Sequence, residues 1–367
     1  MTPLDLSPSP AGEAAIRDSD LKERLAAAPR NTFYAVLVRD LVNQQQRRDA
    51  ERARKAGLTV LERRRESLRD RLQSQPLSDS DRHYIHSVLA LCALPYRRPT
   101  DGTRDFIREY GKSSLVVQSG YLKDPVTGKM TAQGLPYGPK ARLLMLHICT
   151  MAVRQNSHQI EIADSMSAFI RELGFPVTGG ARGTINQFKE QLNRLAASRM
   201  QIGVWREDRS TTISTQPIEA FDVWLPNHPD QRALWSTTLT LDKRFYETLR
   251  DHALPIDIRT LQAFTQSAKQ IDMVLWLAYR LRTVSKPTML SWEALQGQFG
   301  SDVTSRSRKF RQSFADDLAH IVEVFPTMPA RLTEKGMLLS LRLVVGSSPL
   351  RIASKRRLAS FRAVSGV

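Results

Sequence analysis

From Pro139 onward, the chain alternates short amphipathic helices with strand-like runs, and the order of these elements limits the folds that it can adopt. A first helix is predicted over residues 141–153, where apolar side chains on all sides indicate burial. A second helix is predicted to follow Asp164 as its N-cap and to stop at Gly174. A third follows the turn Thr178-Gly-Gly-Ala-Arg-Gly183, and its apolar residues are three and four positions apart: Ile185, Phe188, Leu192 and Leu195.

Strand-like runs follow the third helix. Residues 200–205 and 218–225 are predicted to form a hairpin around the polar tip 206–210, and residues 236–241 are predicted to add a strand. Two helices, a turn, a third helix and a hairpin make up the order of a winged helix. In that fold the third helix enters the major groove of DNA and the hairpin contacts the backbone.

The same order is predicted a second time. Its elements are helices at 268–282, 292–299 (capped by Ser291) and about 304–324, and strands at 324–327 and 338–345. Helical spacing predicts buried faces on the first and third of these helices, made by Ile271, Val274, Leu275, Ala278 and Leu281 and by Phe310, Phe314, Leu318 and Ile321. We interpret the pattern as a tandem repeat of one DNA-binding unit, at 139–253 and 254–348, followed by a basic C-terminal tail at 349–367. The alternative is a pair of packed helical bundles with amphipathic surfaces. The expected fold class is mainly α with small β-hairpins (α+β).

Basic and amide side chains on the two third helices, and near the hairpin tips, are the candidate DNA contacts. In the first repeat they are Arg182, Asn186, Lys189, Asn193 and Arg194. In the second repeat they are Arg306, Arg308, Lys309, Arg311, Gln312, Arg331 and Lys335. The first turns of a recognition helix reach base edges in helix-turn-helix docking, which favours the cluster from Arg306 to Gln312. The glycines around Arg182 either bring helix amides against a phosphate or make a tight turn between packed helices, and the tight turn is favoured.

The composition is that of a globular and strongly basic protein. The chain has 367 residues, with 54 Lys and Arg against 37 Asp and Glu, so its net charge is +17. With 41% hydrophobic residues it is too apolar to be wholly disordered, and its length suggests two or three domains. Clustered Lys and Arg displace counterions from phosphates, so the charge favours nucleic acid over a membrane as partner. A basic face kept for solubility is the alternative.

Membrane, secretory and disulfide signals are missing from the sequence. No apolar run has the length of a membrane span, and the first residues lack a signal-peptide pattern. We therefore expect a soluble, cytoplasmic protein. Its two cysteines, Cys92 and Cys149, lie outside any CxxC or CxxH pair and are interpreted as buried thiols.

Motifs that resemble enzyme sites lack required features. Gly111-Lys112-Ser113 resembles the end of a P-loop, but Phe106 stands where that motif requires glycine. His83-x-x-His86 lacks the alternating spacing of a strand-borne nickase site, so a surface or packed pair is expected. The sequence thus predicts no catalytic residue, no metal ion and no cofactor.

The segments before Pro139 are assigned mainly from composition. Residues 1–12 are rich in Pro and Ser and are predicted to be a disordered N-terminus. Residues 13–94 are predicted to be a helical basic arm with a break at Gly57, and residues 95–138 a Pro/Gly-rich connector with a hairpin. The arm fits a coiled element for self-association, a DNA-backbone contact or a solvated helical tail equally well.

Five stretches between Gly134 and Leu195 carry a family resemblance, and the glycine turn is the distinctive one. They are Gly134-Leu-Pro-Tyr-Gly-Pro-Lys-Ala-Arg-Leu-Leu144, the run 162–169, Leu173-Gly174, Thr178-Gly-Gly-x-x-Gly183 and Gln191-Leu-x-Arg-Leu195. Together they resemble the plasmid-encoded RepA-type replication initiators, most clearly over about residues 110–250.

The resemblance implies a fold and a function. It implies two winged-helix domains that bind repeated sites, called iterons, in double-stranded origin DNA and help to open the duplex. The implied partners are host replication proteins, such as the host initiator and the replicative helicase. A transcriptional repressor with the same two domains is the alternative, because initiators and repressors share DNA-binding physics. An enzyme such as a primase or nickase is the third hypothesis.

Overall fold

A computed structural model describes residues 10–31, 33–111, 113–124, 127–180, 182–206, 209–221, 238–300 and 307–340. The chain divides into two units, residues 1–64 and 65–367. The first unit is therefore shorter than the predicted arm over 13–94, because Leu68, Leu72 and Ile85 belong to the core of the second unit.

The first unit is built from helices around a small apolar core of its own. It contains α1 (Pro10–Ala14), α2 (Ser19–Ala26), α3 (Tyr34–Ala56) and the start of α4 (Val60–Ser74). Ile16, Leu21 and Leu41 form the core. Asp18 accepts hydrogen bonds from Arg48 at 3.0 Å and from Arg52 at 2.7 Å, and these donors lower its pKa to about 2. Helix α3 ends at Gly57, as predicted.

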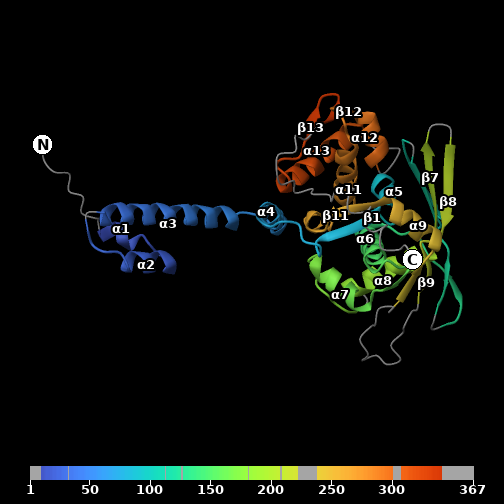
Figure 1. Ribbon diagram of the computed structural model, residues 1–367, viewed down its shortest axis with the longest axis horizontal. Helices are drawn as coiled ribbons and strands as arrows, with labels where there is room; N and C mark the ends of the chain where they lie inside the picture. Colours follow the sequence, from blue (N-terminus) through green and yellow to red (C-terminus); the bar gives the residue numbers. More distant parts are fainter. Residues whose placement is uncertain are drawn as a thin grey trace, which may run out of the picture. The chain divides into compact units, whose positions relative to one another are not determined.

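Six elements occur twice in the second unit, in the same order. The first set is α6 (Gly138–Gln155), β6 (Gln159–Glu161), α7 (Ala163–Glu172), α8 (Thr184–Ala197), β9 (Ile218–Phe221) and β10 (Thr238–Leu241). The second set, orange and red in Figure 1, is α11 (Ala268–Thr283), β12 (Thr288–Ser291), α12 (Trp292–Phe299), α13 (Ser307–Val324), β13 (Ala330–Thr333) and β14 (Gly336–Leu339). We call these sets the first and second repeat.

The strands of the two repeats pair in the same way. The sheet order is β6-β10-β9 in the first repeat and β12-β14-β13 in the second, and all pairs are antiparallel. The last strand of each repeat thus lies between the other two. Neither β6 nor β12 was predicted, because each is too short to show a period in the sequence.

The predicted hairpin of the first repeat is wrong. Strand β7 (Arg199–Arg206) pairs with β8 (Arg209–Thr215), whereas β9 pairs with β10. Arg206 and Arg209 of the predicted polar tip are therefore paired residues of β7 and β8, the two strands labelled in Figure 1, and residues 207–208 lie outside the described residues. The prediction passed over β8 because its sequence, Arg-Ser-Thr-Thr-Ile-Ser-Thr, lacks the apolar pattern by which strands are recognised.

The predicted connector over 95–138 also contributes strands. It contains β2 (Asp105–Tyr110), β3 (Ser113–Gln118), β4 (Tyr121–Lys123) and β5 (Met130–Ala132). Strands β2 and β3 form the expected hairpin, and β3 pairs further with β7 in the order β2-β3-β7-β8. Strands β4 and β5 form a separate two-stranded hairpin.

Two further corrections concern the ends of helices. Helix α7 begins at Ala163 after Ile162, so Asp164 lies inside the helix and is not its N-cap. The strand predicted at 324–327 does not form, because α13 extends to Val324 and Phe325 is buried directly after it. In contrast, Ser291 caps α12 as predicted, since its hydroxyl accepts from the amide of Ala294 at 3.2 Å.

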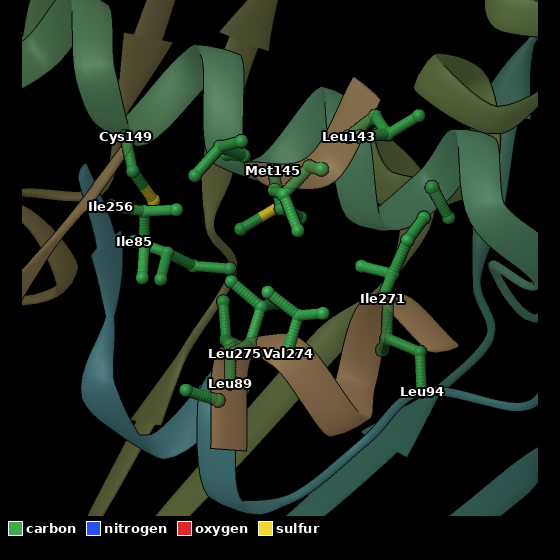
Figure 2. Close-up of a cluster of buried hydrophobic side chains, with 14 of the residues drawn as sticks. Ile85, Leu89, Leu94, Leu143, Met145, Cys149, Ile256, Ile271, Val274 and Leu275 are labelled. Carbon is green, nitrogen blue, oxygen red and sulfur yellow. The ribbon is translucent and has the colours of Figure 1, made fainter. Parts of the chain in front are cut away.

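The two repeats share one core. Helices α6 and α11 pack with α5 (Ser87–Leu91) and with the antiparallel pair β1 (Arg82–His86) and β11 (Ala253–Asp257). Figure 2 shows Met145 of α6, Val274 and Leu275 of α11 and Leu89 of α5 within this core. Two short helices, α9 (Lys243–His252) and α10 (Arg259–Gln262), flank β11 in the chain.

A buried ion pair joins the first helices of the two repeats. Arg142 of α6 donates to both carboxylate oxygens of Asp272 of α11, at 2.6 and 2.8 Å. Its guanidinium also donates to the carbonyl oxygens of Pro95 and Gly138, at 3.0 and 2.8 Å. Both charged side chains are at most 5% exposed. This pair therefore holds α6 against α11 inside the core.

Both cysteines are buried, as predicted. Burial raises the pKa of each thiol to about 12. In the part of the chain that the structure describes, none of the helices combines the length and apolar character needed to span a bilayer.

Candidate nucleic-acid interface

Helix α13 presents a basic surface in its first turns. Phe310, Phe314 and Leu318 bury one side of the helix, as the sequence predicts. Arg308, Lys309 and Arg311 are exposed. The predicted contact Arg306 lies outside the described residues.

A contact between two helices holds one of these arginines. The guanidinium carbon of Arg311 lies 5.5 Å from the ring centroid of Trp292, the first residue of α12. The indole nitrogen of Trp292 donates to the carbonyl oxygen of Glu334 at 2.9 Å, in the turn between β13 and β14. Trp292 thus links the basic first turns of α13 to the β13–β14 hairpin. The sequence carries no signal for this contact, because the residues lie on separate elements.

The remaining predicted DNA contacts of the second repeat differ in whether their side chains are free to bind DNA. Arg331 and Lys335 are exposed on β13 and in the β13–β14 turn. The amide of Gln312 donates to the carboxylate of Asp316 at 2.8 Å, so a contact with DNA would have to displace this bond.

The glycine turn before α8 is closed by its own hydrogen bonds. The hydroxyl of Thr178 accepts from the amide of Thr184 at 3.1 Å, and its carbonyl oxygen accepts from Ile185 at 3.2 Å. Gly180 has a φ of +83°, and a Cβ on Gly183 would collide with the carbonyl oxygens of Gly179 and Thr178. Because the first helix amides are satisfied within the protein, this geometry supports the tight turn over a phosphate site.

Four candidates of the first repeat lie in or near this turn and along α8. Arg182 is exposed. Asn186 donates its side-chain amide to the carbonyl oxygen of Gly180 at 2.6 Å, so it supports the turn. Lys189 and Asn193 are half-buried, and burial lowers the pKa of Lys189. Phe188 and Leu192 of the same helix are buried, as predicted.

The position of Arg194 corrects the sequence-based prediction that it contacts DNA. Its side chain is buried and donates to the carbonyl oxygen of Leu135 at 3.1 Å. It also pairs with Glu190 at 2.9 Å and lies 5.1 Å from the ring centroid of Tyr137. The guanidinium is therefore used to hold the segment before α6 against α8.

The His83-x-x-His86 motif is a packed pair in this structure. His83 stacks on Phe169 at 5.8 Å, and His86 stacks on Phe245 at 5.9 Å between ring centroids. Within the described ranges, no three or more His, Cys, Asp or Glu side chains gather as a metal site would require.

Comparison with known families confirms the resemblance seen in the sequence. Residues 135–294 match the family described as plasmid encoded RepA protein. Over this stretch the chain is similar to the RepA family. The matched stretch covers α6 through the start of α12, and so includes α8 and the glycine turn.

Other comparisons of this chain are weaker. A crystal structure of selenomethionine derivatives of domain 2 and domain 3 of RctB aligns with 64% of this chain and 85% of its own chain. The sequence identity is 10% and the TM-score is 0.41, a level of likeness that supports no conclusion about fold or function. Among curated proteins, no sequence matches the chain.

Proposed function

We propose that the protein initiates plasmid replication by binding repeated origin sequences, the iterons, through two winged-helix domains. In this proposal the domains are the two repeats, and α8 and α13 are the helices that enter the major groove. Binding helps to open the duplex and recruits host replication proteins, and the chain itself performs no catalysis. The match of residues 135–294 to the RepA family is the observation that carries the proposal.

The arrangement of elements supports two DNA-binding domains. In each repeat a helix and strand precede two helices and two strands, and the last strand lies between the other two. Such an order presents the third helix beside a hairpin, as winged helices do when they bind a groove and the adjacent backbone.

The charge on α13 supports its use as a reading helix. Arg308 and Arg311 are exposed in its first turns, and arginine can donate two hydrogen bonds to one guanine. We expect the double variant Arg308→Ala/Arg311→Ala to weaken origin binding by about 1–3 kcal/mol and to relax base preference at one position. Titration of labelled origin DNA measures both effects.

The matched control removes two exposed arginines elsewhere, Arg97 and Arg244. This control should keep base preference unchanged. A folded Arg308→Ala/Arg311→Ala variant with the affinity of the control would contradict the role of α13.

Footprinting on plasmid DNA separates initiation from repression. Two different domains in one chain have no internal two-fold axis, so the expected sites are direct repeats, with about 20 base pairs protected per monomer. Protection of an inverted repeat by dimers alone would favour the repressor instead.

A further inference from the structure

The β4–β5 hairpin lies outside the apolar core. In its two described strands no residue is buried, and only Leu122 is half-buried. The amide of Gln133 donates to the carbonyl oxygen of Gly120 at 2.8 Å and closes the base of the hairpin. An isolated two-stranded hairpin is only marginally stable in water, so its attachment to the protein must hold it in place.

That attachment is made to helix α8. A Cβ on Gly120 would collide with the carbonyl oxygen of Ala197, and a Cβ on Gly134 would collide with the guanidinium of Arg194. Beyond the hairpin, the side chain of Gln191 accepts from the amide of Tyr137 at 3.0 Å. Both ends of the hairpin are therefore fixed to the C-terminal half of α8, the helix that carries Lys189 and Asn193.

One face of the hairpin combines lysine with exposed apolar side chains. Tyr121 lies opposite Ala132, and Lys123 lies opposite Met130, so all four share a face. Tyr121 is 48% exposed and Met130 is 65% exposed. Lys129 directly precedes Met130, so strand alternation places it on the other face, at the exposed end of the hairpin.

Neighbouring groups fix the orientation of this face. Arg104 donates to the phenolic oxygen of Tyr121 at 3.0 Å, and its guanidinium carbon lies 5.4 Å from the ring centroid. The carboxylate of Asp124 accepts from the amide of Thr127 at 2.8 Å, so it serves the turn. The resulting face is basic and partly apolar.

We propose that the β4–β5 hairpin is a second DNA-binding element of the first repeat. It contacts the duplex beside the groove that α8 enters, with Lys123 and Lys129 at phosphates. Tyr121 and Met130 lie against sugars and base edges in the minor groove, where apolar side chains are used by other DNA-binding proteins. This inference rests on the proposed function, because it requires α8 to bind DNA. The three cations Arg104, Lys123 and Lys129 favour DNA over an apolar protein partner.

The test is the salt dependence of binding by the full-length double variant Lys123→Ala/Lys129→Ala. Each phosphate contact contributes about 0.9 to the slope of log K against log salt, so the slope should fall by about 1.8. A hydroxyl-radical footprint on origin DNA should lose its protected flank beside the groove of α8, while that groove stays protected. The matched control is Lys22→Ala/Lys243→Ala, which removes two exposed lysines from α2 and α9.

A second variant tests the apolar part. Tyr121→Ala/Met130→Ala should leave the salt slope unchanged but shorten the footprint, and thermal unfolding checks that the protein still folds.

If the wild-type protein leaves a footprint and the lysine variant matches the control in slope and footprint, the hairpin proposal is overturned while the proposed function stands. A wild-type protein without any origin footprint overturns both. Loss of plasmid replication with unchanged DNA binding would also overturn the assignment and indicate a protein partner.

Discussion

Among the described residues of the second unit, three histidine rings are buried, and burial keeps them neutral. It lowers the pKa of His83 to about 4 and the pKa values of His86 and His147 to about 3. His147 stacks on Phe169 at 4.3 Å, on the same ring that His83 contacts. At this scale burial also decides which polar side chains can meet a ligand, since it removes Arg194 from the surface and leaves Arg308 on it.

The histidines predict an acid-sensitive fold. Their folded-state pKa values lie below the unfolded value of about 6.5, so the unfolded chain binds more protons as the pH falls below 6.5. The contribution of the neutral histidines to the free energy of unfolding is therefore fully present above pH 6.5 and is lost as the pH falls toward 4. Each buried ring should cost about 2 kcal/mol between pH 6.5 and pH 5.

Urea unfolding at pH 7 and pH 5 measures this loss. His83→Phe, which keeps a ring against Phe169, should reduce the difference between the two pH values. His158→Gln alters a half-buried ring and is the matched control. If the unfolding free energy of His83→Phe changed with pH as much as that of the wild type, His83 would not contribute to the acid sensitivity.

Among the elements, the turn before α8 leaves no room for a side chain on Gly183. The hydrogen bonds that Thr178 accepts from the first amides of α8 bring the carbonyl oxygens of Thr178 and Gly179 against Gly183. By contrast, a Cβ on Gly297, in α12, would meet no atom within 4 Å.

These two glycines should respond in opposite directions to alanine. Gly183→Ala must open the turn and should cost about 1–3 kcal/mol of unfolding free energy, as overpacking does. Gly297→Ala should stabilise the protein by about 0.5–1 kcal/mol, because glycine is unfavourable inside a helix. Equilibrium unfolding of both variants tests this. A Gly183→Ala variant as stable as the wild type would refute the described turn.

At the scale of the whole second unit, the two repeats are parts of one folded body. Helices α6 and α11 lie in a common core, and the pair Arg142–Asp272 crosses between them. Arg108 of β2 adds another link, because it donates to the carbonyl oxygen of Gly300 at 3.1 Å, at the end of α12. The two proposed reading helices, α8 and α13, therefore belong to one folded unit.

Breaking the buried pair should destabilise both repeats together. Asp272→Leu leaves the charge of Arg142 buried without its carboxylate and should cost about 3–5 kcal/mol. Arg142→Met/Asp272→Leu should lose less than the sum of the single variants, because neither charge remains. Asp79→Ala, which breaks the exposed pair with Arg82, is the control and should cost under about 1 kcal/mol. Separate unfolding transitions for the two repeats would contradict this coupling.

The sequence by itself determined what depends on neighbouring residues. Helical spacing predicted the buried faces of α8, α11 and α13, and Ser291 predicted the start of α12. The glycine turn and its flanking motifs identified the RepA family, which the comparison confirms over residues 135–294.

Only the tertiary structure decided which distant segments meet. It paired β7 with β3, placed Arg194 against the segment before α6, and joined Arg142 to Asp272. A polar residue on a predicted helix face gives no sign of whether another segment will cover it. The physical reason is that strand pairing and burial depend on contacts between residues far apart in sequence, whereas helix periodicity and capping are local.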